Sequence, residues 1–216
     1  MYTSIPNLLT LSRIAVIPIL VAVLYVESDV ARWVGCTLFT IAAITDYLDG
    51  YLARAWSEQS ALGRLLDPIA DKVLVASTLL MLVAFERISG LGLIAALVIL
   101  AREILVSGLR EFLAELQVGL PVSRLAKWKT TIQMVAIGFL IVGDSGPADI
   151  PVNAIGEVGL WTAALLTLVT GYDYLRASLR HVNDEPRQPA SARHDEPEDA
   201  AIPVGPHRAA RGGPGA

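Results

Sequence analysis

The chain has 216 residues, of which 54% are hydrophobic, and its formal net charge is −4. Its mean hydropathy of +0.54 is too high for an ordinary soluble domain, and the apolar residues come in blocks, so the composition indicates a polytopic membrane protein. The single Cys36 excludes a disulfide framework and a cysteine metal site. The three histidines, His181, His194 and His207, lie at or beyond the end of the last apolar block. Acid–base and metal chemistry should therefore depend on carboxylates.

Six apolar blocks follow one another along the chain, and each is expected to form a membrane-spanning helix. The first covers roughly residues 5–26, and the second begins near 33 and continues into the aspartates that start at 46. The other four cover roughly 68–85, 88–109, 128–142 and 152–175. Pro68 is expected to be the first residue of the third helix, with Asp67 as its N-cap. Several uncharged cores are shorter than the ~20 residues that a span needs. Polar residues must therefore complete those spans at the interface or around a water-filled cavity.

The distribution of basic residues predicts the orientation of these helices. The connections at 27–32 and 143–153 are expected on the outer side, which keeps only Arg32 and Arg87. All other arginines and lysines of the apolar region fall on the opposite side, as the positive-inside rule requires if both termini are cytoplasmic. Beyond about Val182 the chain is rich in Pro, Ala, Gly and charged residues without periodicity. Residues 1–182 are therefore expected to form the membrane domain and 183–216 a disordered cytoplasmic tail.

Four aspartates, Asp46, Asp49, Asp67 and Asp71, lie within the second and third blocks. On helices, the first pair is three residues apart and the second pair four, so each pair shares a face. One interpretation is helix capping with salt bridges to neighbouring basic residues. However, four carboxylates in one patch would repel one another, and carboxylates within a membrane usually mark a functional site. Divalent cations would remove the repulsion, and an all-oxygen ligand set suits Mg²⁺ or Mn²⁺.

The aspartates belong to a longer pattern, Asp46-x2-Asp49-Gly50-x2-Ala53-Arg54-x8-Gly63-x3-Asp67-x3-Asp71. This pattern resembles the signature of the CDP-alcohol phosphatidyltransferases, a family of integral-membrane enzymes of phospholipid biosynthesis. The resemblance implies that all four aspartates hold two metal ions, Mg²⁺ or Mn²⁺, and that Asp71 also acts as general base. It further implies a set of residues that bind CDP-diacylglycerol: Asn7, Thr10, Gly50, Ala53, Arg54 and Ser60. Simpler interpretations are helix packing for the glycines and an interfacial position for Arg54.

Two later blocks bear on the acceptor. The sequences AREILVSGLREF at Ala101–Phe112 and KWKTTIQ at Lys127–Gln133 resemble the phosphatidylglycerophosphate synthase branch of the family. Arg102 lies within an apolar segment, where a cation is costly unless it meets an anion. Arg102, Arg110 and Lys127 are expected to bind the phosphate of the acceptor. The alternative interpretation is pairing with neighbouring glutamates and anchoring at the membrane surface.

Together these features predict an all-α membrane protein, a bundle of six transmembrane helices with a metal-containing polar cavity open to the cytoplasmic interface. The resemblance implies a transferase of the cell membrane that moves the phosphatidyl group from CDP-diacylglycerol to glycerol 3-phosphate, giving phosphatidylglycerophosphate and CMP. It also implies a homodimer, and nothing indicates nucleic-acid binding. The same reaction with inositol phosphate or phosphatidylglycerol as acceptor is an alternative. A divalent-cation transporter is an alternative of another class, although it would not need Gly50, Ala53 and Arg54.

Overall fold

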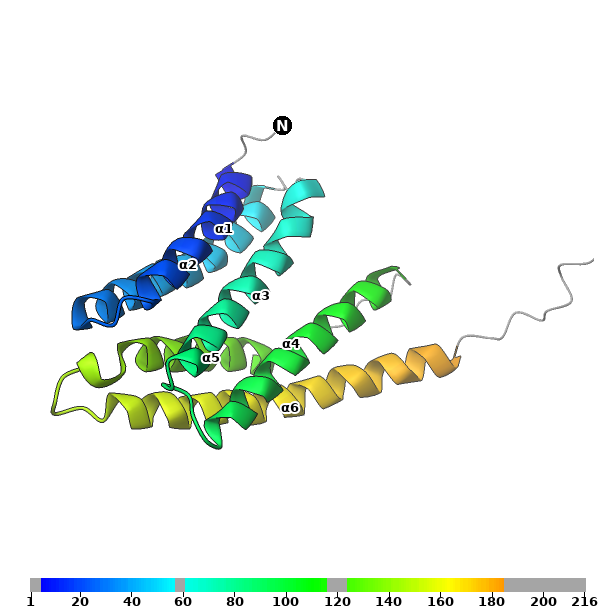
Figure 1. The fold of residues 1–216 in the computed structure, drawn as a ribbon. Helices are drawn as coiled ribbons and strands as arrows, with labels where there is room; N and C mark the ends of the chain where they lie inside the picture. The colour runs from blue at the N-terminus through cyan, green and yellow to red at the C-terminus, as the bar shows by residue number, and fades with distance from the viewer. Residues whose placement is uncertain (1–4, 57–60, 116–123, 185–216) are drawn as a thin grey trace, which may run out of the picture.

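The computed structural model describes residues 5–56, 61–115 and 124–184, and within these ranges it is helical, with no strand (Figure 1). The all-α prediction is therefore confirmed for the described part of the chain. The helices are α1 (Ile5–Leu24), α2 (Asp29–Trp56), α3 (Ala61–Ala84), α4 (Gly92–Glu115), α5 (Arg124–Val142) and α6 (Val152–Asp184), with a short 3-10 helix η1 (Gly143–Ser145). The predicted tail lies outside the described residues from 185 onward.

The predicted start of the third helix is wrong. Helix α3 begins at Ala61, so Asp67 and Pro68 lie inside it rather than at its first turn. An internal proline removes one backbone hydrogen bond and disfavours a helix by about 3 kcal/mol, but the leucine-rich turn before it has strong helix propensity. Asp67 therefore cannot serve as the N-cap of this helix, and the capping interpretation of this aspartate is wrong.

The helices pack in a connected series. Helix α1 packs against α2 and α3, α2 reaches α5, and α6 packs along both α5 and α4 (Figure 1). A continuous apolar core joins these contacts, with Leu20 of α1, Phe39 of α2, Leu74 of α3, Ile99 of α4 and Ile137 of α5 all buried. This core fixes the relative positions of the helix faces that carry the polar residues.

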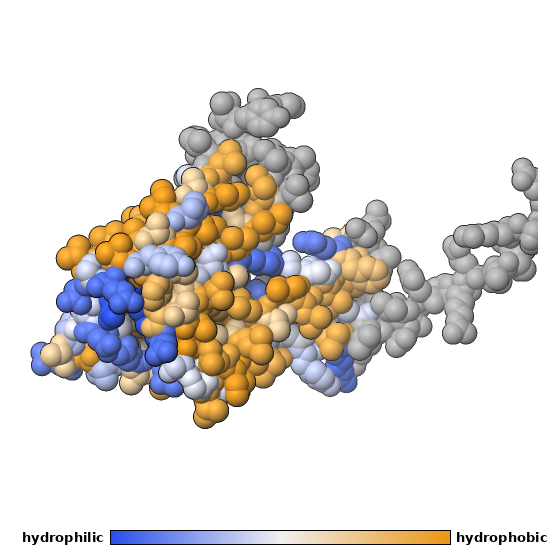
Figure 2. All heavy atoms as spheres, in the orientation of Figure 1, coloured by the Kyte–Doolittle hydropathy of each residue, from blue (hydrophilic) through white to orange (hydrophobic). Residues whose placement is uncertain are grey.

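Within the residues that the structure describes, two helices are long and apolar enough to cross a membrane, at Gly92–Ala114 and Val152–Arg176. Both are only one-third buried, whereas the apolar helix of a soluble core would turn its apolar residues inward. Leu97, Ile104 and Leu165 are among the large apolar side chains that lie exposed instead, and Figure 2 shows hydrophobic residues over much of the face drawn. This surface suggests a membrane protein; that all six helices span the bilayer remains a prediction.

The two connections predicted on the outer side meet at one end of the bundle. The indole Nε1 of Trp33 donates to the carbonyl oxygen of Ser145 at 3.1 Å, and the Ser145 hydroxyl donates to Asp29 at 2.5 Å. The α3–α4 connection joins them, because Arg87 donates to the carbonyl oxygen of Ile141 at 2.9 Å. Figure 2, drawn in the orientation of Figure 1, shows hydrophilic residues gathered at this end. Three alternate connections thus share one side, as an up-and-down bundle requires.

Helices α5 and α6 approach closely at a glycine. A Cβ atom added to Gly159 would lie 2.8 Å from the Cβ of Ala136, whereas one added to Gly108 of α4 would meet no atom within 4 Å. We expect Gly159→Ala to lower the midpoint of thermal unfolding in detergent, because overpacking costs about 1–3 kcal/mol. The matched variant Gly108→Ala should leave the midpoint unchanged or raise it, because alanine is the better helix former. Equal behaviour of the two variants would contradict this account of the α5–α6 contact.

Candidate functional site

Asp46, the first aspartate of the signature, is held by a buried arginine. Arg13 of α1 is 1% exposed and donates from Nη1 to Asp46 Oδ1 of α2 at 2.5 Å. A guanidinium in an apolar environment is stable only when an anion neutralises it. Sequence analysis missed this pair, although Arg13 is the sole charged residue of the first apolar block. The ion pair fixes α1 against the part of α2 that carries the signature.

Asp71, the last aspartate of the signature, lies in the wall of a cavity between α3, α4 and α5. The cavity has a volume of about 250 Å³, and its polar lining includes Asp71 and Lys72 of α3, Glu103 of α4 and Gln133 of α5. Asp46 and Glu103 both act electrostatically on Asp71 as like charges, and Lys72 and Arg13 act as opposite charges. The first and last aspartates of the signature therefore share one electrostatic environment although they lie on different helices.

The other predicted site residues are only partly described. Asp49 lies on α2 three residues after Asp46, and Asp67 lies on α3 four residues before Asp71, as the predicted face sharing requires. Their side chains lie outside what the structure describes. Only the helical backbone is described for Asn7, Thr10, Gly50, Ala53 and Arg54, and Ser60 lies wholly outside the described residues. Among the side chains that are described, no three His, Cys, Asp or Glu residues converge. The metal and nucleotide sites thus remain predictions.

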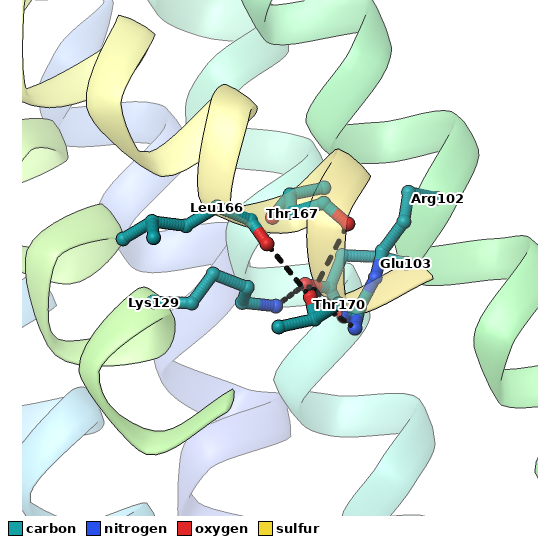
Figure 3. Close-up of polar contacts among 6 residues, drawn as sticks. All are labelled: Arg102, Glu103, Lys129, Leu166, Thr167 and Thr170. Atoms are coloured by element: carbon teal, nitrogen blue, oxygen red, sulfur yellow. Dashed lines mark hydrogen bonds and ion pairs between the residues drawn. The ribbon is translucent and has the colours of Figure 1, made fainter. Parts of the chain in front are cut away.

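A charged network next to the cavity joins three helices (Figure 3). Glu103 of α4 receives a hydrogen bond from Lys129 of α5, and Arg102 Nη1 lies 3.5 Å from the same oxygen, Glu103 Oε1. Arg102 also donates from Nη2 to Thr170 Oγ1 of α6 at 3.0 Å. Lys129 is 3% exposed. Two cations, Arg102 and Lys129, therefore meet the one carboxylate of Glu103.

The three residues predicted to bind the acceptor phosphate differ in position. Arg102 is half-buried within the charged network, and its Nε makes no hydrogen bond in the described part of the chain. Arg110 lies eight residues further along α4 and Lys127 lies at the start of α5, and both are exposed. Sequence analysis chose Lys127 and missed Lys129, the lysine of the same block that faces α4. The two lysines are two residues apart, so they lie on different sides of α5.

Comparison with known proteins supports the resemblance of the signature. The family model described as CDP-alcohol phosphatidyltransferase matches residues 3–169. The chain belongs to the CDP-alcohol phosphatidyltransferase family.

Similar members of this CDP-alcohol phosphatidyltransferase family bear one name. The chain is 47% identical over 178 residues to a protein of Rickettsia bellii, covering 82% of this chain and 97% of the relative. It is 39% identical over 218 residues to a protein of Cereibacter sphaeroides, covering 84% and 98%, and 42% identical over 187 residues to one of Salmonella choleraesuis, covering 86% and 100%. Each is named CDP-diacylglycerol--glycerol-3-phosphate 3-phosphatidyltransferase. The similarity spans almost the full length of each relative.

Proposed function

We propose that this chain is a CDP-diacylglycerol–glycerol-3-phosphate 3-phosphatidyltransferase. It transfers the phosphatidyl group of CDP-diacylglycerol to glycerol 3-phosphate and releases CMP. The observation that carries the proposal is the near full-length identity of 39% or more to relatives named for this reaction. The complete aspartate signature on α2 and α3 also supports it, because its carboxylates are the candidate metal ligands and general base.

Asp46, Asp49, Asp67 and Asp71 would hold one or two Mg²⁺ or Mn²⁺ ions. Their donor atoms are all carboxylate oxygens, the ligands that these hard cations prefer. When bound, the metal supplies neutralisation of the negative charge on the diphosphate. Arg13 supports this arrangement, because its bond to Asp46 Oδ1 orients that carboxylate next to α1.

Asp71 acts as the general base. A carboxylate in the wall of the cavity reaches the primary hydroxyl of an acceptor that enters there, and it takes the hydroxyl proton. The freed oxygen forms a bond to the phosphorus that carries diacylglycerol. The bond from this phosphorus to the oxygen of CMP breaks, and CMP leaves with the electron pair. The proton stays on Asp71 until solvent takes it up.

The remaining predicted residues divide between the two substrates. Asn7, Thr10, Gly50, Ala53, Arg54 and Ser60 would bind CDP-diacylglycerol, and Arg102, Arg110 and Lys127 the phosphate of the acceptor. The acceptor phosphate would share Arg102 with Glu103 and Thr170, which its terminal nitrogens already contact. We further propose that all six helices span the cell membrane, with both termini and the active site cytoplasmic, and that the chain forms a homodimer.

The test is CMP release by the purified protein in detergent with CDP-diacylglycerol and Mg²⁺ or Mn²⁺. Glycerol 3-phosphate, inositol phosphate and phosphatidylglycerol are compared as acceptors. We expect turnover with glycerol 3-phosphate alone, and none when a chelator removes the divalent cation. Turnover only with another acceptor would overturn the proposed acceptor but not the reaction. No turnover in folded protein with any acceptor would favour the cation transporter instead.

A further inference from the structure

Gln133 is a buried polar residue that the proposed reaction does not yet use. It lies on α5 and is 2% exposed, and its Oε1 accepts no hydrogen bond from the described residues. A buried acceptor without a partner costs about 1–3 kcal/mol, so such groups in native structures usually have a specific role. The candidate partner of this oxygen is a ligand in the cavity that Gln133 lines.

Gln133 lines the same cavity as Asp71. The cavity also contacts Glu103, and its other walls are largely apolar, with Val75, Leu100 and Met134 among them. Its volume of about 250 Å³ is smaller than the ~300–1,000 Å³ of sites for drug-sized ligands. The space therefore suits a small molecule, and a molecule bound there would lie next to both Asp71 and Gln133.

The charged network lies on the same face of α5 as Gln133. Lys129 precedes Gln133 by four residues, so the two share a face of α5, and the bond from Lys129 to Glu103 ties that face to α4. Lys129 and Glu103 already bond each other, whereas Gln133 Oε1 accepts no hydrogen bond from the described residues. An amide oxygen accepts a hydrogen bond from a hydroxyl without adding charge next to Asp71.

We propose that Gln133 determines acceptor specificity by accepting a hydrogen bond from the hydroxyl adjacent to the one that Asp71 deprotonates. This inference rests on the proposed function and extends it. Glycerol 3-phosphate carries a secondary hydroxyl on the carbon next to its primary hydroxyl, so one small molecule can meet both residues. A site built to bond a hydroxyl rejects an analogue that lacks it, because the buried protein group is then left unpaired.

The test compares glycerol 3-phosphate with 3-hydroxypropyl phosphate, which lacks the secondary hydroxyl, in the wild type and in Gln133→Met. The wild type should lose at least about tenfold in kcat/KM with the analogue. Gln133→Met should lose about as much with glycerol 3-phosphate, but should show little further loss with the analogue. Thr131→Val, on the exposed side of α5, should behave as the wild type. Gln133→Leu provides a second apolar variant if the methionine variant does not fold.

Two outcomes would overturn the inference. In one, Gln133→Met uses glycerol 3-phosphate as well as the wild type does. In the other, the losses from the substitution and from the missing hydroxyl multiply, which means that the two groups do not contact each other. A wild-type protein that releases no CMP with glycerol 3-phosphate would instead refute the proposed function, so the two failures are distinguishable.

Discussion

Replacing Asp71 with asparagine is expected to reduce the rate of CMP release by about 10²–10⁴-fold, the usual contribution of a general base. Asparagine keeps the size of the side chain but cannot take the proton of the acceptor hydroxyl. It also removes one negative ligand from the proposed metal site, which acts in the same direction. The measurement is kcat with saturating CDP-diacylglycerol and glycerol 3-phosphate at a fixed concentration of divalent cation.

Asp149→Asn provides the matched control for this variant. Asp149 is exposed in the connection between η1 and α6, at the end of the bundle where the outer connections meet. The same chemical change there should leave the rate unchanged, and both variants should keep the thermal midpoint of the wild type. An Asp71→Asn protein that is folded and retains more than about a tenth of the wild-type rate would exclude Asp71 as general base.

The sequence predicted the helices because each apolar block is long and punctuated by turn residues. It also placed the connections before Arg32 and after Val142 on one side, and they are joined by the hydrogen bonds that Ser145 accepts from Trp33 and donates to Asp29. Helix boundaries were harder to predict from the sequence. At Pro68 a local rule for helix starts predicted a boundary, but the helix-forming residues before it continue the helix through the proline.

The pairing of charges across helices could not be read from the sequence. That Arg13 meets Asp46, or that Lys129 rather than Lys127 meets Glu103, depends on how each helix is rotated about its axis. This rotation is set by packing of the whole core, in which Leu20 and Ile137 are buried, and not by spacing within one helix. The aspartates were predictable because they form a contiguous signature, whereas Gln133 stood out only once its burial was known.

The ion pair between Lys129 and Glu103 is expected to contribute strongly to stability. Lys129→Met should lower the free energy of unfolding by about 1–3 kcal/mol, because it leaves the half-buried carboxylate of Glu103 with only the more distant Arg102 as partner. The measurement is the midpoint of thermal or denaturant unfolding in detergent. Lys127→Met, an exposed lysine of the same helix, should cost less than about 0.5 kcal/mol. Equal small losses would show that the buried pair is not a principal tie between α4 and α5.

A double variant tests whether the Lys129–Glu103 pair positions Gln133. Glu103→Leu combined with Lys129→Met removes both charges, and much of the lost stability should return, because apolar side chains replace a buried ion pair at little cost. If stability returns while discrimination against 3-hydroxypropyl phosphate is lost, the pair acts by positioning Gln133. If discrimination persists, Gln133 is held by helix packing alone. The charges on α4 and α5 then stabilise the bundle and do not contribute to acceptor specificity.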